Sequence, residues 1–331
     1  MAAATTRIRD DVRYGYAVGR VRVLEGRLLQ RPTFERLLDA PDLREQKRIL
    51  AETHVGRYLE SVESAEDVER GLEASLADLY DDFLAAADLP AAIVRYFQIP
   101  HDYANLRAAV KARLVGIELD GLFSGLGSVP AEAFVGTGAG LPAPFSELLT
   151  AWDDAETPPA LDDVEAAIDR ALFAALLAAA KESRVKLLRE LTVLRIDVAN
   201  ARLLLRARAK AMPSAEFADR LLPGGSRALA GLATSASRMG TEELAEAIVK
   251  TRALGRIEAH DLADIERFDL VGDRLVAERM LAARQAPGGA EPVLAYVLAR
   301  EAEVLVLRTL VAGRLAGLDR EAVRVRMRER G

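Results

Sequence analysis

The sequence predicts an all-α protein, and three observations support this fold class. Ala, Leu, Arg and Glu dominate the composition, and these residues are among the strongest helix formers. Gly and Pro are concentrated between long segments in which apolar residues recur every three or four positions. Half of the residues are apolar and 29% are charged, which is the balance of a folded globular protein.

Clusters of Gly and Pro interrupt the helical pattern at residues 121–130, 136–144, 223–225 and 287–292. We expect loops or domain boundaries there, because both residues interrupt helices. One cluster contains Gly136-Thr-Gly138-Ala-Gly140, but it lacks the Lys-Ser/Thr pair of a phosphate-binding loop. It is interpreted as a flexible loop.

Composition and charge exclude several classes of protein. There is no cysteine, so disulfides and thiolate metal sites are impossible, and His54, His101 and His260 are far apart in the sequence. The net charge of −6 gives no general attraction to nucleic acid. The longest apolar run, residues 171–180, is about half of what a bilayer requires. With no signal-like start either, we expect a cytoplasmic protein without a spanning segment.

One motif recurs along the chain. Asp102-Tyr-Ala-Asn105-Leu-Arg107 and Asp197-Val-Ala-Asn200-Ala-Arg202 place acid, Asn and Arg at identical offsets. A third copy, Glu303-Val-Leu-Val306-Leu-Arg308, keeps the acid and the Arg, and a fainter copy surrounds Arg20. The four arginines are 87, 95 and 106 residues apart, which is the length of a small helical domain. The repeats predict domains at 1–118, 119–213 and 214–331.

Each copy lies on a pattern typical of an amphipathic helix with one buried face. The acid and the Asn do not share a simple helical stripe with the Arg, yet they could link neighbouring helices. We interpret the polar residues as a partly buried network that fixes helix packing. The alternative is that the arginines line a shared cavity. The network would comprise Asp102, Asn105, Asp197, Asn200 and Glu303, and the cavity would be lined by Arg107, Arg202 and Arg308.

Four segments of the chain carry a further signal: YGYAVGRVRVLEGRLL, DYANLRAAVKARLVG, DVANARLLLRARAK and LAYVLAREAEVLVLRTLVAGRLAGL. Together they resemble the C-subunit family of V/A-type rotary ATPases, which is related to the d subunit of the vacuolar enzyme. The resemblance runs from about Tyr14 to the C-terminus. Val306 departs from it, since the family often has Asn there, and Gly19 stands where Ala is frequent.

The resemblance implies three similar helical domains around a pseudo-threefold axis, which form a funnel with a central cavity. The funnel would sit peripherally on the cytoplasmic face of the proteolipid rotor ring, near the stator membrane subunit. It would receive the D and F subunits of the central stalk and transmit torque during ion transport and ATP synthesis or hydrolysis. We expect a monomer in isolation, without catalysis, cofactor, metal or nucleic-acid partner.

Two further alternatives come from the residues. A prenyl-chain synthase would need magnesium-binding acids, for which Asp153-Asp154-Ala-Glu156 and Asp162-Asp163-Val-Glu165 are the nearest matches, but both resemble helix-start acids. A helical-repeat scaffold of another assembly would share the repeats.

Five arginines between residues 320 and 330 predict a basic amphipathic tail, either solvated or in contact with lipid headgroups. Trp152, Tyr96, Phe97 and Tyr296 are expected in the core.

Overall fold

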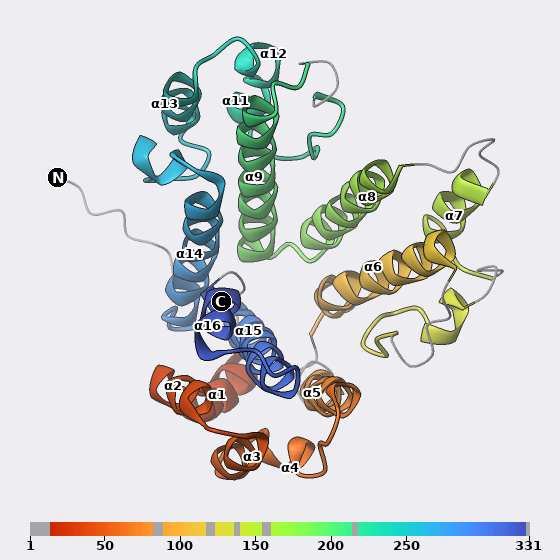
Figure 1. Ribbon diagram of the computed structural model, residues 1–331, viewed down its shortest axis with the longest axis vertical. Helices are drawn as coiled ribbons and strands as arrows, with labels where there is room; N and C mark the ends of the chain where they lie inside the picture. Colours follow the sequence, from red (N-terminus) through yellow and green to blue (C-terminus); the bar gives the residue numbers. More distant parts are fainter. Residues whose placement is uncertain are drawn as a thin grey trace. The chain divides into compact units, whose positions relative to one another are not determined.

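The fold is built from helices, as the sequence predicts (Figure 1). The computed structural model describes residues 14–81, 89–116, 123–135, 140–153, 160–213 and 218–328. Within these ranges every regular element is a helix and none is a strand. None of the helices described there is both long and apolar enough to cross a lipid bilayer. The all-α class is therefore confirmed.

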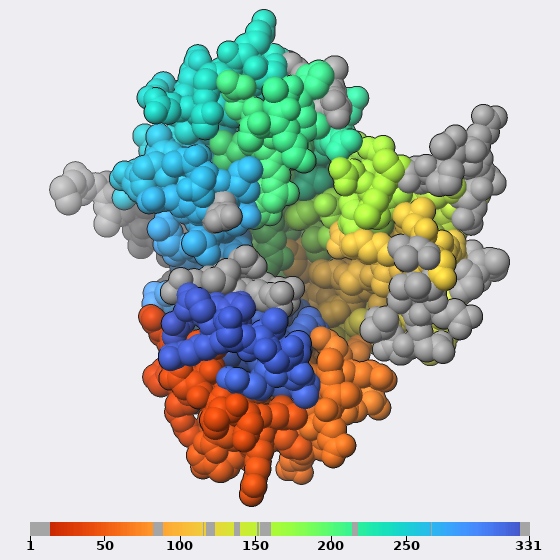
Figure 2. Space-filling view, in the orientation of Figure 1, coloured from red at the N-terminus to blue at the C-terminus, as the bar shows by residue number. Residues whose placement is uncertain are grey.

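Contacts divide the chain into two compact units, and the first of them joins both ends of the sequence, Met1–Leu89 and Asp273–Gly331. Its long central helix, α15, packs against α5, α1 and α3. Figure 2 shows the C-terminal helices, in blue, lying against the N-terminal ones, in red and orange. The helices of this unit are α1 (Gly15–Leu24), η2 (Glu25–Arg27), α2 (Arg31–Asp39), α3 (Leu43–Ala51), α4 (Gly56–Leu59), α5 (Ala65–Leu79), α15 (Glu291–Leu315) and α16 (Arg320–Arg328).

The second unit is the middle of the chain, Pro90–Gly272. Its main contacts are between α6 and α8 and between α8 and α9. Helix α14 (Ile265–Arg284) begins in this unit and ends in the first one. The other helices are α6 (Ala91–Val115), η4 (Ala131–Phe134), α7 (Phe145–Asp153), α8 (Leu161–Glu182), α9 (Lys186–Ala209), α11 (Arg227–Ala230), α12 (Ala233–Ala236), α13 (Thr241–Thr251) and η5 (Ala259–Leu262).

Local sequence signals explain where several helices begin and end. The Ser64 side chain accepts a hydrogen bond from the Asp67 amide, and the Asp67 carboxylate accepts one from the Ser64 amide, so α5 begins with a reciprocal capping box. Helix α6 ends at Gly116, whose φ of 71° is left-handed and favours glycine. The cluster at 223–225 falls between helices, as predicted, whereas the cluster at 287–292 extends from the connection after α14 into the first two residues of α15.

Burial explains why α15 occupies the centre of its unit. Val304, Leu307 and Val311, which are three or four residues apart on this helix, are all buried, and so is Tyr296. Tyr96 and Phe97 are buried in the second unit, where the Tyr96 hydroxyl lies 2.9 Å from Thr192 Oγ1. Trp152 is only half-buried.

The C-terminal helix α16 packs on α15 and α2. A methyl group at Gly313 would lie 2.9 Å from a Val323 methyl carbon, so glycine permits a close approach of the two helices. Arg320 pairs with Asp39 at 2.5 Å and Arg324 lies 3.7 Å from Glu35. At these two positions, the basic tail therefore contacts acids of its own unit.

Candidate functional site

The first copy of the motif fastens a loop to α6. The buried Asp102 carboxylate accepts hydrogen bonds from Ser128 Oγ at 2.7 Å and from the Val129 amide at 3.0 Å. Asn105 exchanges two hydrogen bonds with the backbone of Ser124, donating to its carbonyl at 2.9 Å and accepting from its amide at 2.8 Å. The side chains thereby satisfy backbone groups that no helix pairs.

The second copy repeats this geometry on α9. Buried Asp197 accepts from the Ser226 amide at 2.7 Å. Asn200 donates to the Leu222 carbonyl at 2.9 Å and accepts from the Leu222 amide at 2.8 Å. Burial raises the pKa of the Asp197 carboxyl, while the Ser226 hydrogen bond acts in the opposite direction.

A glycine lies beside the acid in both copies. A Cβ atom at Gly127 would lie 2.1 Å from Asp102 Oδ1, and one at Gly225 would lie 2.5 Å from Asp197 Oδ1. No side chain larger than hydrogen fits at this approach without a shift. The repeat therefore extends beyond the helix and includes a glycine in the loop that the motif acid binds.

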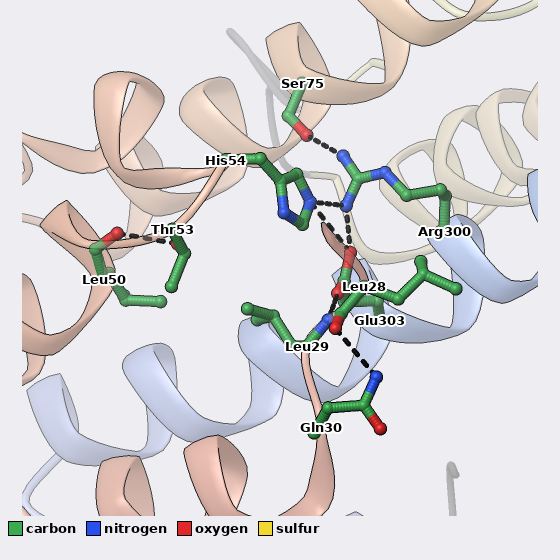
Figure 3. A network of polar contacts seen from close by, with 9 residues as sticks. All are labelled: Leu28, Leu29, Gln30, Leu50, Thr53, His54, Ser75, Arg300 and Glu303. Carbon is green, nitrogen blue, oxygen red and sulfur yellow. Dashed lines mark hydrogen bonds and ion pairs between the residues drawn. The ribbon is translucent and has the colours of Figure 1, made fainter. Parts of the chain in front are cut away.

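In the third copy, the motif acid contacts a segment from the N-terminal part of the chain. Buried Glu303 on α15 accepts a hydrogen bond from the amide of Leu29, which follows η2 (Figure 3). Val306 stands at the position of the Asn and has no polar group, so the backbone exchange made by Asn105 and Asn200 is absent from this helix position. The link from the motif acid to a loop backbone is nevertheless kept.

Glu303 also belongs to a buried charge network that sequence reasoning missed. Its carboxylate pairs with Arg300 Nη1, and His54 Nε2 lies 3.1 Å from it. Arg300 donates a second hydrogen bond to Ser75 Oγ at 3.0 Å. Arg300 lies three residues before Glu303 on the same helix, a spacing that could have revealed this pair. His54 and Ser75 carry no such local signal.

The three motif arginines are bound in ion pairs, and each is about two-thirds buried. Arg107 pairs with Glu165 and Asp169 of α8, both at 2.6 Å. The other two pairs are Arg202 with Asp269 of α14 and Arg308 with Glu69 of α5, the latter at 2.7 Å.

The three pairings follow one cyclic rule in the chain order. The partner helix of α6 is α8, which directly precedes α9. The partner helix of α9 is α14, which precedes α15, and that of α15 is α5, which precedes α6 in the chain. Each arginine therefore links its helix to the helix that leads into another motif helix.

Two of the acids considered for a magnesium site, Glu165 and Asp163, are engaged in ion pairs. Glu165 contacts Arg107 and also Lys111 at 2.7 Å, and Asp163 pairs with Arg220 at 3.0 Å. Burial acts to raise the pKa of Glu165, but Lys111 and Arg107 together bring it below its ordinary value. Asp154 and Glu156 lie outside the described residues, as do positions 136–139 of the glycine-rich loop. Among described residues no group of His, Cys, Asp and Glu could hold a metal ion.

Comparison with known proteins gives a consistent result. Residues 17–326 match the family described as ATP synthase (C/AC39) subunit. The C subunit of the A-type ATP synthase of Thermococcus kodakarensis is 29% identical, with 94% of this chain and 89% of the relative aligned. The corresponding protein of Haloquadratum walsbyi is 29% identical, with 93% of this chain and 96% of the relative aligned. That of Thermococcus onnurineus is 27% identical, with 90% of this chain and 85% of the relative aligned.

Proposed function

Because this chain belongs to the ATP synthase (C/AC39) subunit family, we propose that it is the coupling subunit of an A-type rotary ATP synthase. It would be a non-catalytic socket that joins the D and F subunits of the central stalk to the membrane rotor ring. The observation that carries this proposal is the match over residues 17–326, together with near full-length relatives that are C subunits of A-type ATP synthases. A helical scaffold of an unrelated assembly is not favoured by any comparable observation.

We further propose that repeats 1–118, 119–213 and 214–331 surround a pseudo-threefold axis and enclose a funnel-shaped cavity. The support comes from the equivalent loop contacts of Asp102 and Asp197 and from the cyclic ion pairs of the three motif arginines. Three similar units arranged in a closed ring would pair in such a cyclic order.

The role of the arginines follows from their partners. Arg107, Arg202 and Arg308 each have a carboxylate within the fold, so a large part of their charge is neutralised there. We therefore propose that they brace neighbouring helices, in preference to lining the socket. Bracing suits a coupling subunit, because a compliant body would store rotational work as strain. Closely packed helices resist such deformation.

Catalysis is not required for this role. The proposed subunit would pass torque between the ATP-hydrolysing head and the ring, while the chemistry and ion transport take place in other chains. It would be held peripherally at the cytoplasmic face of the membrane through the ring, with the stator membrane subunit as a neighbour, and would be a monomer when isolated.

The experiment is a pull-down of the tagged chain from detergent-solubilised membranes of its source, followed by identification of the bound proteins. We expect recovery of the D and F stalk subunits and of the proteolipid ring subunit. The untagged parent chain, carried through the same procedure, serves as the control. Recovery of partners without any head, stalk or ring subunit would contradict the proposal.

A further inference from the structure

A polar cavity of about 540 Å³ lies within the unit formed by the two chain ends, apart from the motif arginines. Its walls come from α1, η2, α4, α5 and α15 and from the connection after α3. Part of its lining is visible in Figure 3, where His54, Thr53, Ser75 and Arg300 are drawn. The volume falls in the range of small-ligand sites.

The charge of this lining is predominantly positive. Asp78 forms an ion pair with Arg57 at 2.8 Å, and Arg300 forms one with Glu303, which does not line the cavity. Arginines outnumber acids in the lining. The charged residues of the lining are four arginines and two acids, namely Arg20, Arg27, Arg57, Arg300, Glu60 and Asp78.

Arg27 supplies the clearest excess charge. It is exposed, and it forms no ion pair with a residue in the part of the chain that the structure describes. The motif arginines differ in this respect, because each has a carboxylate partner. A guanidinium group that faces a cavity and has no carboxylate partner is available to an anionic ligand.

The innermost wall is built from buried polar groups. The side chain of Arg300 is only 5% exposed, and Tyr296 on the same helix is also buried. Burial raises the pKa of the Tyr296 phenol and so does the negative charge of Glu303, whereas the positive charges of Arg300, Arg27 and Arg20 act to lower it. His54 Nδ1 is buried and has no hydrogen-bond partner among the described residues.

We propose that this cavity is a binding site for a small polyvalent oxyanion of the phosphate class. The guanidinium groups offer several donors in a fork that matches phosphate oxygens, and the lining adds the hydroxyls of Tyr296 and Ser75, of which the Ser75 oxygen accepts from Arg300. The volume is larger than one phosphate group needs, so a diphosphate or a small phosphate ester fits the chemistry better than a monovalent anion. The proposal is independent of the coupling role.

Isothermal titration of the purified full chain with pyrophosphate tests this proposal. The ionic strength is held constant and magnesium is omitted, because salt screens exposed charges. We expect saturable binding at one site. Arg27→Gln should weaken it by about tenfold, the effect of losing one hydrogen bond to a charged group. Tyr296→Phe, which keeps the ring and removes the hydroxyl, should also weaken it.

The matched control is Arg31→Gln. Arg31 lies four residues from Arg27, outside the cavity, and its side chain is 90% exposed. The control should bind pyrophosphate like the parent. Arg27→Gln should melt like the parent, because Arg27 has no ion pair to lose among the described residues. Arg31→Gln should also melt like the parent, because its pair with Glu35, at 3.8 Å, is exposed and contributes little. Thermal melting of Tyr296→Phe, which preserves the packed ring, checks that this variant is folded.

Two results would overturn the proposal. One is the absence of binding heat, or equal affinity of the parent and Arg27→Gln. The other is binding of a glutamate-rich peptide by a chain that does not bind pyrophosphate, which would make the cavity a docking site for an acidic protein segment.

Discussion

Glu303 on α15 accepts a hydrogen bond from the backbone amide of Leu29, a residue 274 positions earlier in the chain. The same carboxylate compensates the buried guanidinium of Arg300, and both side chains are about 5% exposed. One acid therefore ties the start of the chain to its last long helix and balances a buried charge. The stability of the unit formed by the chain ends should depend on it.

The first prediction is that Glu303→Ala lowers the free energy of unfolding by about 3 to 5 kcal/mol. Removing one partner leaves the Arg300 charge buried without compensation. Urea unfolding followed by circular dichroism measures the change. The double variant Glu303→Leu and Arg300→Met should recover much of the loss, because it removes both charges. A double variant no more stable than Glu303→Ala would show that the ion pair is not the cause.

The second prediction concerns Asp197. Asp197→Ala should destabilise the fold by about 1 to 3 kcal/mol, since the Ser226 amide loses its acceptor. Asp197→Asn keeps an acceptor and removes a charge whose burial raises the pKa of the carboxyl. At neutral pH the Asn variant should be at least as stable as the parent.

The difference in stability between Asp197→Asn and the parent should depend on pH. A raised pKa in the folded state means that ionisation of Asp197 costs stability above that pKa, and the cost disappears as the pH falls and the carboxyl is protonated. The advantage of Asp197→Asn over the parent should therefore shrink between neutral and acid pH. Chemical unfolding at several pH values measures the gap. A gap that is independent of pH would contradict burial as the cause.

The third prediction tests the glycine beside each motif acid. Gly225→Ala should cost about 1 to 3 kcal/mol, because its Cβ would lie 2.5 Å from Asp197 Oδ1 and 2.8 Å from Ile196 Cγ2. The control is Gly19→Ala on α1, where a Cβ meets nothing within 4 Å. That change should stabilise the helix by about 0.5 to 1 kcal/mol. Equal melting temperatures for the two variants would argue against the close approach.

The fourth prediction distinguishes bracing from socket roles for the motif arginines. In a double-mutant cycle of Arg202→Met and Asp269→Asn, the coupling energy should be about 0.2 to 1 kcal/mol, as is usual for partly exposed pairs. Folded Arg202→Met should bind the isolated D and F stalk like the parent. Weaker stalk binding by a variant with unchanged melting would favour the socket role.

The helices and the motif positions could be predicted from the sequence because both depend on local patterns. The three-to-four periodicity reveals α6, α9 and α15, and the shared offsets reveal Asp102 with Asn105 and Asp197 with Asn200. The loop backbones that these side chains contact could not be predicted. Nearly every residue has a backbone amide and a carbonyl, so the sequence does not indicate which of them accepts or donates such a hydrogen bond.

Contacts between distant segments could not be predicted for a different reason. In the sequence His54 is one of three scattered histidines, yet folding brings it within 3.1 Å of Glu303. A linear division into repeats likewise does not reveal that α15 packs on α5 and α1. The division at 1–118, 119–213 and 214–331 stays a prediction. Identifying such pairs requires information on which segments fold together.

The last prediction concerns coupling and depends on the proposed function. If this chain joins stalk to ring and performs no chemistry, a complex assembled without it should still hydrolyse ATP at the soluble head. Ion pumping should be lost, because torque no longer reaches the ring. Membrane vesicles from a strain that lacks the chain allow both activities to be measured on one preparation, with ATP hydrolysis followed by phosphate release and pumping by a pH-sensitive or membrane-potential dye.

Restoring the parent chain should restore pumping, and this is the positive control. Restoring Glu303→Ala should restore less pumping than the parent, because the lower stability of this variant leaves less folded subunit. Restoring Arg27→Gln should bring pumping back, because that residue belongs to the proposed anion site and not to the brace. Loss of head hydrolysis together with pumping would contradict a purely mechanical role, since removal of a passive joint leaves the catalytic subunits intact.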